Sequence, residues 1–451
     1  SQLYLTIFVV YMYILIYILI IIIIMIFIII LISIFYFKYR LHIEVSYFLK
    51  LMKTLKLSNF EKIFDVEDKF TNLVKNFSIE DAQKIKDIEK ITNHDVKAVE
   101  YFFKDKMKEW DLTEFSEFVH FALTSQDINT SAIMLPLQEC FKEELLPILY
   151  SLNQLLNKRI EEWYNIPILC RTHGQPAVPS TMGKEFKVFL YRLEQQTKEE
   201  IKLFTKFGGA VGSFNAHHYA YPNIDWIKFA DEYIEELGLV RSKYTTQIEN
   251  YDSLSKVLDN LKRVNTILLD LCQDTWLYIS FDYFKLKINE NETGSSVMPF
   301  KINPIDFENA EGNLLIANTL IEFFSRKLPV SRLQRDLTDS TITRNLGTCI
   351  AHSLIAYKSI LKGMGKLEIN KTKINEDLEN NWIIITEGIQ TVLRTKGING
   401  YEIMKKLTRV SGKVTKNDLK ITLGKFLPPD EVDELMKLTP FNYIGYSNKI
   451  I

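Results

Sequence analysis

The chain has 451 residues, 47% of them hydrophobic and 25% charged, so it can bury a large core and is expected to form more than one domain. Its formal net charge of −1 excludes a general attraction to nucleic acid or to an anionic membrane, so an anionic ligand would have to be held by local arginines and lysines. The four cysteines are far apart and lack the spacing of metal ligands, which indicates reduced thiols and a cytoplasmic location.

The first segment differs from the rest of the chain. Residues 1–37 contain no charged side chain, and positions 14–32 are almost entirely isoleucine and leucine. By length this segment qualifies as a membrane-spanning helix flanked by Lys38 and Arg40. Its composition is also what translated A/T-rich non-coding DNA would produce, and we prefer this interpretation because the remaining chain is typical of a cytosolic enzyme. We therefore expect no membrane association unless residues 1–37 are native.

Apolar residues recur at helical spacing through most of the remaining chain. The pattern predicts a helix from about 40 to 57, and Ser78 opens a capping-box sequence, Ser-Ile-Glu-Asp, before another helix. Long helices are predicted over 131–163, 251–284 and 304–327. The second of these has no internal glycine or proline and would extend about 45–50 Å. Helices of this length need neighbours along their whole length, so we expect an all-α fold with a long central helical bundle.

Breaks in the helical pattern near residues 113 and 366 suggest three domains. They predict an N-terminal helical domain over 38–113, a central bundle domain over 114–365 and a small C-terminal helical domain over 366–451. Irregular segments are expected at roughly 90–96, 124–130, 170–182, 206–224, 288–303 and 331–345. These segments carry the polar side chains that could perform chemistry.

The most informative irregular segment is Gly-Ser-Ser-Val-Met-Pro-Phe-Lys-Ile-Asn-Pro, residues 294–304. The hydroxyls of Ser295 and Ser296 precede the cation of Lys301, and Asn303 is predicted to cap a helix. A nearby ammonium and the positive end of a helix would stabilise a serine alkoxide or a substrate oxyanion. Gly-Ser-Ser alone would more often be an ordinary loop that caps a helix.

Three other polar clusters have both a functional and a plain interpretation. His173 lies in Arg-Thr-His-Gly-Gln-Pro rather than on an apolar helix face, which suits a catalytic and a surface role about equally. His94 and Asp95 begin a predicted helix, where Asp95 could simply favour the helix dipole. Thr124 and Ser125 could hold a phosphate or only cap a helix.

Arginines and hydroxyls alternate in a late segment of the chain. Surface solvation explains many such clusters, but hydroxyls interleaved with arginine are also how proteins bind dianionic groups. The side chains concerned are Arg332, Arg335, Ser340, Thr341, Thr343 and Arg344.

Taken in order, these motifs resemble the adenylosuccinate lyase family, in particular its bacterial-type branch. The matching blocks are NHDVKAVEYF, TSQDIN, RTHGQPA, YTTQIE, GSSVMPFKINPIDFEN and DLTDSTITRNL, and the resemblance covers about residues 40–451. This family belongs to the fumarase/aspartase/argininosuccinate lyase superfamily. The resemblance therefore implies a three-domain, all-α, fumarase/aspartase-like fold whose signature loop is 288–303.

The resemblance also implies a role in purine nucleotide biosynthesis. The family eliminates fumarate from adenylosuccinate, giving AMP, and from the imidazole carboxamide precursor SAICAR, giving AICAR. The serine at the Ser295 position removes the proton from the succinyl Cβ, and groups such as Lys301 and Asn303 hold the developing aci-carboxylate. The histidine at the His173 position then protonates the leaving nitrogen.

Further substrate contacts are carried over by resemblance alone. They are Asn93, His94, Asp95, Thr124, Ser125, Gln247, Ser296, Asn309, Arg335, Ser340, Thr341, Ile342, Thr343 and Arg344. The family implies no metal or organic cofactor and no nucleic-acid partner. It implies a homotetramer in which each site draws residues from three subunits.

Three features depart from the family pattern. No segment like Ser-Pro-Leu-Asp-Gly-Arg-Tyr, whose Arg and Tyr help to bind substrate, precedes Lys38. Phe300 stands where this branch has histidine, and Gln126 stands where it has glutamate. The last two are flanking positions, so they leave the reaction class intact.

Two alternative functions stay open. The chain could be another fumarate-releasing lyase of the superfamily, which an assay for released AMP would distinguish. It could also be an inactive scaffold protein with the same fold. The hydrophobic start and the missing Gly-Arg-Tyr segment favour the scaffold, whereas Ser295, Lys301 and His173 oppose it.

Overall fold

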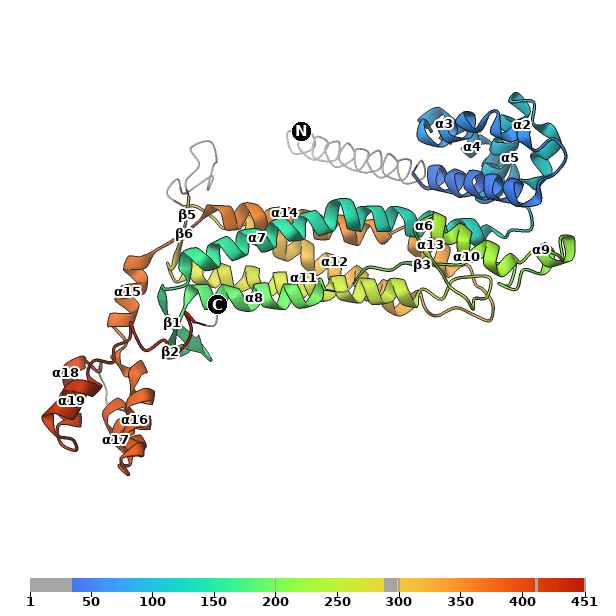
Figure 1. Cartoon of the computed structure of the whole chain (residues 1–451). Helices are drawn as coiled ribbons and strands as arrows, with labels where there is room; N and C mark the ends of the chain where they lie inside the picture. The colour runs from blue at the N-terminus through green and yellow to red at the C-terminus, as the bar shows by residue number, and fades with distance from the viewer. Residues whose placement is uncertain (1–34, 199, 288–297, 299–300, 410–412, 450–451) are drawn as a thin grey trace, which may run out of the picture. The chain divides into compact units, whose positions relative to one another are not determined.

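The structure, a computed structural model, describes residues 35–198, 200–287, 298, 301–409 and 413–449 (Figure 1). Most of the hydrophobic first segment and the loop residues Ser295, Ser296 and Phe300 lie outside the described residues. Within the described ranges helices predominate, and the strands form three two-stranded sheets, which confirms the predicted all-α class. No helix in these ranges combines the length and apolar character needed to cross a membrane.

Two compact units make up this part of the chain. Unit 1 comprises 35–143, 201–259 and 322–347, and unit 2 comprises 144–200, 260–321 and 348–449. The breaks predicted near 113 and 366 lie close to the ends of α5 (Asp95–Glu109) and α14 (Leu346–Lys366). The division of the sequence into three domains stays a prediction.

Unit 1 opens with a layer of short helices packed through aromatic rings. The rings of Phe48, Phe70 and Phe103 are buried and lie 5.7–5.9 Å apart. The predicted capping box is confirmed, because the Ser78 hydroxyl accepts the Asp81 N–H at 3.2 Å and the Asp81 carboxylate accepts the Ser78 N–H. The helices are one through 35–55, α2 (Glu61–Phe64), α3 (Glu67–Lys75), α4 (Ile79–Thr92) and α5.

The prediction of an irregular segment over 124–130 was wrong, since α6 (Ser125–Cys140) begins at Ser125. The Asp127 carboxylate accepts the Thr124 N–H at 2.8 Å and so starts the helix directly after the apolar run. The other elements of unit 1 are η1 (Thr113–Phe118), β3 (Phe204–Thr205), α9 (Asn215–Ala220), α10 (Trp226–Glu236), β4 (Val240–Arg241), α13 (Thr338–Thr343) and the adjoining ends of α11 and α12.

Unit 2 contains most of the long helices, which run alongside one another (Figure 1). They are α7 (Leu146–Trp163), continuous with η2 (Phe141–Leu145), α8 (Met182–Gln196), α11 (Asp252–Ser280), α12 (Ile305–Lys327) and α14. At 1.5 Å per residue the 29 residues of α11 extend about 43 Å. Leu268 of α11, Leu314 of α12 and Ile360 of α14 are fully buried, so the predicted bundle of apolar stripes is confirmed.

A polar link crosses the bundle inside this apolar core. Asn265 of α11 donates to the Ser353 hydroxyl at 3.0 Å and accepts from the Tyr357 hydroxyl at 2.5 Å, both on α14. All three side chains are fully buried. Their hydrogen bonds satisfy one another, so the link sets the relative register of α11 and α14.

Two departures from the predicted bundle have local causes. The predicted helix over 251–284 ends at Ser280, because Phe284 begins β5 (Phe284–Leu286), which pairs antiparallel with β6 (Leu367–Ile369). α12 begins at Ile305, one residue after the predicted start, and the Pro304 carbonyl accepts its first backbone hydrogen bonds.

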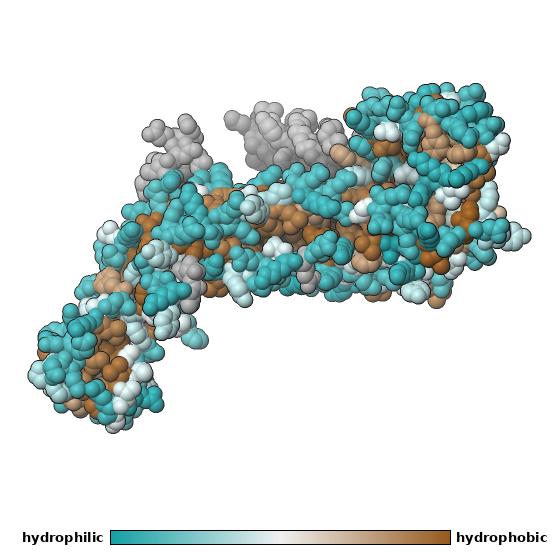
Figure 2. Space-filling model, viewed as in Figure 1, coloured by the Kyte–Doolittle hydropathy of each residue, from teal (hydrophilic) through white to brown (hydrophobic). Residues whose placement is uncertain are grey.

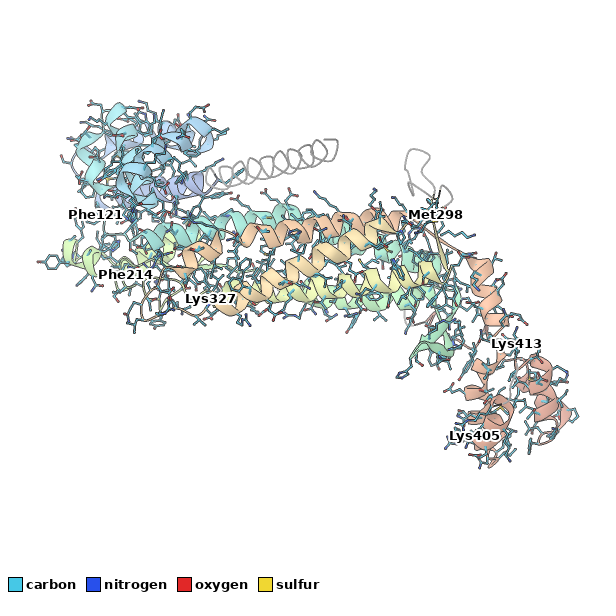
Figure 3. All side chains as sticks on the ribbon, turned by 180° about the vertical axis from the view of Figure 1, so that it is seen from behind. Phe121, Phe214, Met298, Lys327, Lys405 and Lys413 are labelled. Carbon is cyan, nitrogen blue, oxygen red and sulfur yellow. The ribbon has the colours of Figure 1, made fainter. Side chains whose placement is uncertain are left out.

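Small helices follow α14 in unit 2. They are α15 (Lys371–Glu379), η3 (Trp382–Ile385), α16 (Thr386–Thr395), α17 (Gly400–Thr408), α18 (Lys416–Leu423) and α19 (Pro429–Leu435). Ile389, Leu393 and Leu419 are fully buried among them, and hydrophobic residues show between hydrophilic ones in Figure 2. Lys405 and Lys413 lie on these helices and the adjoining loop (Figure 3).

Candidate active site

Several candidate residues meet where α5 and α6 begin in unit 1. Asn93 ends α4 with a left-handed backbone (φ 49°), and His94 is the N-cap of α5. The His94 Nδ1 accepts the Lys97 N–H at 3.0 Å, so Nε2 is the ring nitrogen that can donate. Nε2 lies 3.5 Å from the Ser125 hydroxyl. The structure therefore brings His94 and Ser125 together at two helix N-termini.

The Asp95 carboxylate lies between two guanidinium groups. Its Oδ2 is 2.5 Å from the Arg40 Nη2 and 3.4 Å from the Arg344 Nη2. Burial alone would raise the pKa of Asp95, but the charge and hydrogen bond of Arg40, together with the Val96 N–H and Arg344, hold this pKa below its usual value. Asp95 thus does more than complement the helix dipole, because it joins two segments that are distant in sequence.

Asp127 and Lys206 form a buried ion pair at the start of α6. Both side chains are fully buried, and their Oδ1 and Nζ atoms are 2.8 Å apart. The carboxylate also accepts the backbone N–H groups of Thr124 at 2.8 Å and of Gly208 at 2.9 Å. Burial lowers the pKa of Lys206, and the charge of Asp127 opposes this effect. Because the Asp127 carboxylate is already engaged by these groups, we assign it to capping α6 and not to binding a ligand.

Arg335 is the centre of a second polar cluster in unit 1. We place the Gln126 amide from its partners, so that its oxygen accepts from both Arg335 Nη atoms at 2.7 and 2.8 Å. Arg335 Nη2 also donates to the Ser340 hydroxyl at 3.1 Å. Gln126, the departure from the family pattern, therefore offers a neutral amide where a glutamate would place a carboxylate beside Arg335.

Hydrogen bonds of buried side chains hold the segment around α13 in place. The buried Asp339 accepts a hydrogen bond from the Tyr251 hydroxyl at 3.2 Å, and the buried Thr343 hydroxyl donates to the Asp339 carbonyl at 2.9 Å. The Gln247 N–H donates to the Gln334 carbonyl at 3.3 Å. In the same segment Thr341 and Arg344 are exposed, and Ser340 and Ile342 are half-buried. The roles predicted for Gln247, Thr341, Ile342 and Thr343 stay predictions.

His173 occupies the tip of a hairpin in unit 2. β1 (Pro167–Thr172) pairs antiparallel with β2 (Gln175–Thr181), and Thr172 pairs with Gln175. Only His173 (φ 52°) and Gly174 (φ 74°) connect these partners, and two positive φ angles are typical of a type I′ turn. The predicted irregular segment over 170–182 is thus mostly strand. The His173 side chain is exposed, as a proton donor to a bound ligand needs to be.

The start of α12 in unit 2 carries the other candidates. Lys301 is exposed, and its N–H donates to the carbonyl of Met298, which is labelled in Figure 3. Asn303 is half-buried two residues before the helix. On α12, Asn309 donates to the Ser359 hydroxyl at 2.8 Å. Ser295 and Ser296 of the same loop lie outside the described residues.

Arg40 is a residue of the cluster that the sequence suggested only as a flank of a membrane-spanning helix. Its side chain is 2% exposed, its Nε donates to the buried Asn129 at 2.8 Å, and its guanidinium lies 3.8 Å from the centre of the Tyr36 ring. One signal was available in the sequence. An arginine that continues an apolar helical stripe is buried only when it is paired.

Comparisons with known proteins agree with this fold. A family model described as "Lyase" matches residues 35–317, and one described as "Adenylosuccinate lyase C-terminal" matches residues 331–444. Among solved structures, a fumarate lyase from Mesorhizobium sp. BNC1 aligns with a TM-score of 0.75 at 16% identity, covering 92% of this chain and 93% of that chain. The fold is therefore that of the fumarate lyases, and the predicted fumarase-like fold is confirmed.

Curated relatives narrow the family further. An adenylosuccinate lyase from Dictyostelium discoideum is 49% identical over 421 residues, covering 90% of each chain. One from Escherichia coli (strain K12) is 45% identical over 412 residues, again covering 90% of each chain. The chain belongs to the adenylosuccinate lyase family.

Proposed function

We propose that this protein catalyses the β-elimination of fumarate from adenylosuccinate, giving AMP, and from SAICAR, giving AICAR. Family membership across about 90% of the chain is the first support for this proposal. The observation that carries it is a set of polar contacts in unit 1: Arg344 contacts Asp95, Arg335 donates to the Ser340 hydroxyl, and the Ser125 hydroxyl lies 3.5 Å from the His94 Nε2.

This cluster suits a nucleotide phosphate better than a simple dicarboxylate. Two arginines and two hydroxyls provide the donors that a dianionic group needs, and the N-terminus of the 16-residue helix α6 adds a favourable dipole. Arg344 is 57% exposed on its side chain, so its guanidinium can reach a ligand.

The chemical step needs a base, an acid and a cation. In the proposed reaction Ser295, as alkoxide, takes the proton from the succinyl Cβ, and electron density moves onto the adjacent carboxylate. Lys301 and Asn303 stabilise that aci-carboxylate. As the C–N bond breaks and the C=C bond of fumarate forms, His173 gives a proton to the leaving nitrogen. The exposed position of His173 at a hairpin tip supports this role.

We further propose that the protein acts as a cytoplasmic homotetramer whose sites draw residues from three subunits. The candidate residues His173, Lys301, Asn303 and Asn309 belong to unit 2, and the phosphate cluster belongs to unit 1. Subunit association would bring residues of both units to one site. The exposed apolar side chains on helices such as α12, among them Leu315 and Ile316, support such an association. Sedimentation analysis of the purified protein tests the tetramer.

The decisive experiment is a turnover assay with the purified protein. We expect adenylosuccinate to give AMP and fumarate in equal amounts, and SAICAR to give AICAR and fumarate, when products are separated chromatographically. Argininosuccinate is the control substrate and should give no fumarate. A folded, tetrameric protein that converts neither purine substrate would refute the proposal.

A further inference from the structure

Arg40 is a buried arginine that has no role in the proposed reaction. Its side chain is 2% exposed and belongs to the helix over 35–55 in unit 1. Burying a guanidinium is costly unless it is paired and hydrogen-bonded. One edge of the Arg40 guanidinium is fully paired, because its Nη2 lies 2.5 Å from the Asp95 carboxylate and its Nε donates to Asn129 at 2.8 Å.

Asp95 is shared between this buried arginine and a more exposed one. The same carboxylate oxygen that faces Arg40 lies 3.4 Å from the Arg344 Nη2. The three side chains together carry one net positive charge. Without Arg40, Asp95 and Arg344 would form a neutral pair, and the carboxylate would repel any anion that approached Arg344.

We propose that Arg40 is a positioning residue for the anionic substrate: it neutralises Asp95 so that the charge of Arg344 stays available to a phosphate. This inference rests on the proposed function. Arg40 does so from inside the protein, since its buried guanidinium cannot reach a ligand itself. Asp95 in turn restrains the Arg344 side chain by its second, longer contact.

The contact lengths support these different roles, in which Arg40 neutralises Asp95 and Arg344 binds the phosphate. The Arg40 Nη2–Asp95 Oδ2 distance of 2.5 Å is much shorter than the Arg344 Nη2–Asp95 Oδ2 distance of 3.4 Å, which lies beyond the usual range for an N–H···O hydrogen bond. Asp95 is therefore committed mainly to the buried arginine. Arg344, which is 57% exposed, keeps donors free to turn toward a phosphate.

The test compares four variants by steady-state kinetics on adenylosuccinate and by calorimetric binding of AMP. Arg40→Met keeps the apolar stem and removes the charge, so we expect KM for adenylosuccinate and Kd for AMP to rise about 10- to 100-fold while kcat changes little. Arg40→Lys restores the charge and should stay within about 3-fold of the unmodified protein. The double variant Arg40→Met/Asp95→Asn also removes the carboxylate that would neutralise Arg344, so it should recover part of the affinity lost in Arg40→Met.

Arg241→Met is the matched control. Arg241 is another buried arginine of unit 1, 5% exposed on its side chain and 2.7 Å from Asp231. We expect this variant to lose stability without a change in KM or Kd. A structural role for Arg40 would instead make all Arg40→Met effects follow the loss of folded protein, with no recovery in the double variant.

The outcomes separate the two proposals. If the unmodified protein converts adenylosuccinate and Arg40→Met leaves KM and Kd unchanged, the positioning role is wrong and the lyase assignment stands. A double variant with affinity no better than that of Arg40→Met would also overturn the positioning role. If the unmodified protein does not turn over either purine substrate, the proposed function fails, and AMP binding still decides the role of Arg40.

Discussion

At the scale of single residues, the candidate groups occupy two kinds of environment. Those assigned to chemistry, such as His173 and Lys301, have exposed side chains on a turn and a loop. Some of those assigned to binding are held by partners inside the protein, as Arg335 is by Gln126 and Asp95 is by Arg40. A proton donor needs access to its substrate, whereas a group that sets affinity benefits from a fixed position.

The first residue-scale prediction concerns the acid and the base. His173→Ala and Ser295→Ala should each lower kcat by at least about 10²-fold, because each removes a proton-transfer group. The exposed His173 contributes little to the core, so the circular dichroism spectrum of His173→Ala should not change. Ser296→Ala should be milder, since we assign Ser296 to binding. If Ser296→Ala proves more damaging than Ser295→Ala, the two roles are exchanged.

The second residue-scale prediction concerns the phosphate. Arg344→Ala and Ser340→Ala should raise KM for adenylosuccinate more than they lower kcat, because the phosphate is remote from the breaking bond and is held equally in ground and transition states. Arg332→Ala is the control, because Arg332 belongs to the same segment but the family resemblance assigns it no substrate contact. Its side chain is 81% exposed and lies 3.6 Å from Asp336 in the same segment. An unchanged KM with a large loss of kcat in Arg344→Ala would move Arg344 into the chemistry.

At the scale of elements, the hairpin of β1 and β2 determines where His173 lies. Its two-residue turn needs positive φ at both positions, and glycine meets this need at Gly174 without strain. Histidine tolerates φ 52° less readily than glycine. The strain at His173 is thus located at a site with a proposed catalytic role.

The element-scale prediction tests this turn. Gly174→Ala should introduce about 1–2 kcal/mol of backbone strain and shift the His173 ring, lowering kcat on adenylosuccinate. Gly397→Ala is a matched control, because Gly397 has φ 73° against 74° for Gly174 and an added Cβ meets nothing within 4 Å at either position. Both variants should lose similar stability in urea titrations. Equal kcat values for the two variants would show that the turn does not position His173.

At the scale of the whole molecule, buried titratable groups connect stability with pH. His217 is fully buried against the rings of Phe214 (labelled in Figure 3) and Trp226. Burial lowers the pKa of His217 to about 4, with Lys206 adding to this effect and Asp127 opposing it. The unfolded chain therefore binds a proton between pH about 6.5 and about 4 that the folded protein does not bind. The free energy of unfolding must fall as the pH drops through this window.

The whole-molecule prediction follows from that sign. His217→Phe should flatten the dependence of the urea midpoint on pH between about 6.5 and 4, because it removes a contribution on the order of 3 kcal/mol. His218→Phe changes an exposed neighbour on the same helix and should keep the slope of the unmodified protein. Identical slopes in all three proteins would contradict the buried, neutral state of His217.

Much of the secondary structure was predictable because its causes are local. Apolar spacing predicted the helices of the bundle, and Ser78 with Asp81 marked the start of α4. The strands of the 167–181 hairpin were missed, since Gly174 and three prolines in that stretch resemble a loop more than a strand. Thr124 and Asp127 were assigned to an irregular segment because a helix cap and a phosphate loop use the same residue types.

The sequence by itself determined the helical class, the main helix positions and the motifs that resemble a family of lyases, because these depend on residues close together in the chain. Only the tertiary structure decided which charges meet. Arg40 and Asp95 are 55 positions apart, and Asp95 and Arg344 are 249 positions apart. Both arginines nevertheless contact the same carboxylate oxygen of Asp95. No local pattern encodes such a pairing, since it arises from the packing of separate helices. Burial then gives the pairing its strength, because charges removed from water interact far more strongly than charges on the surface.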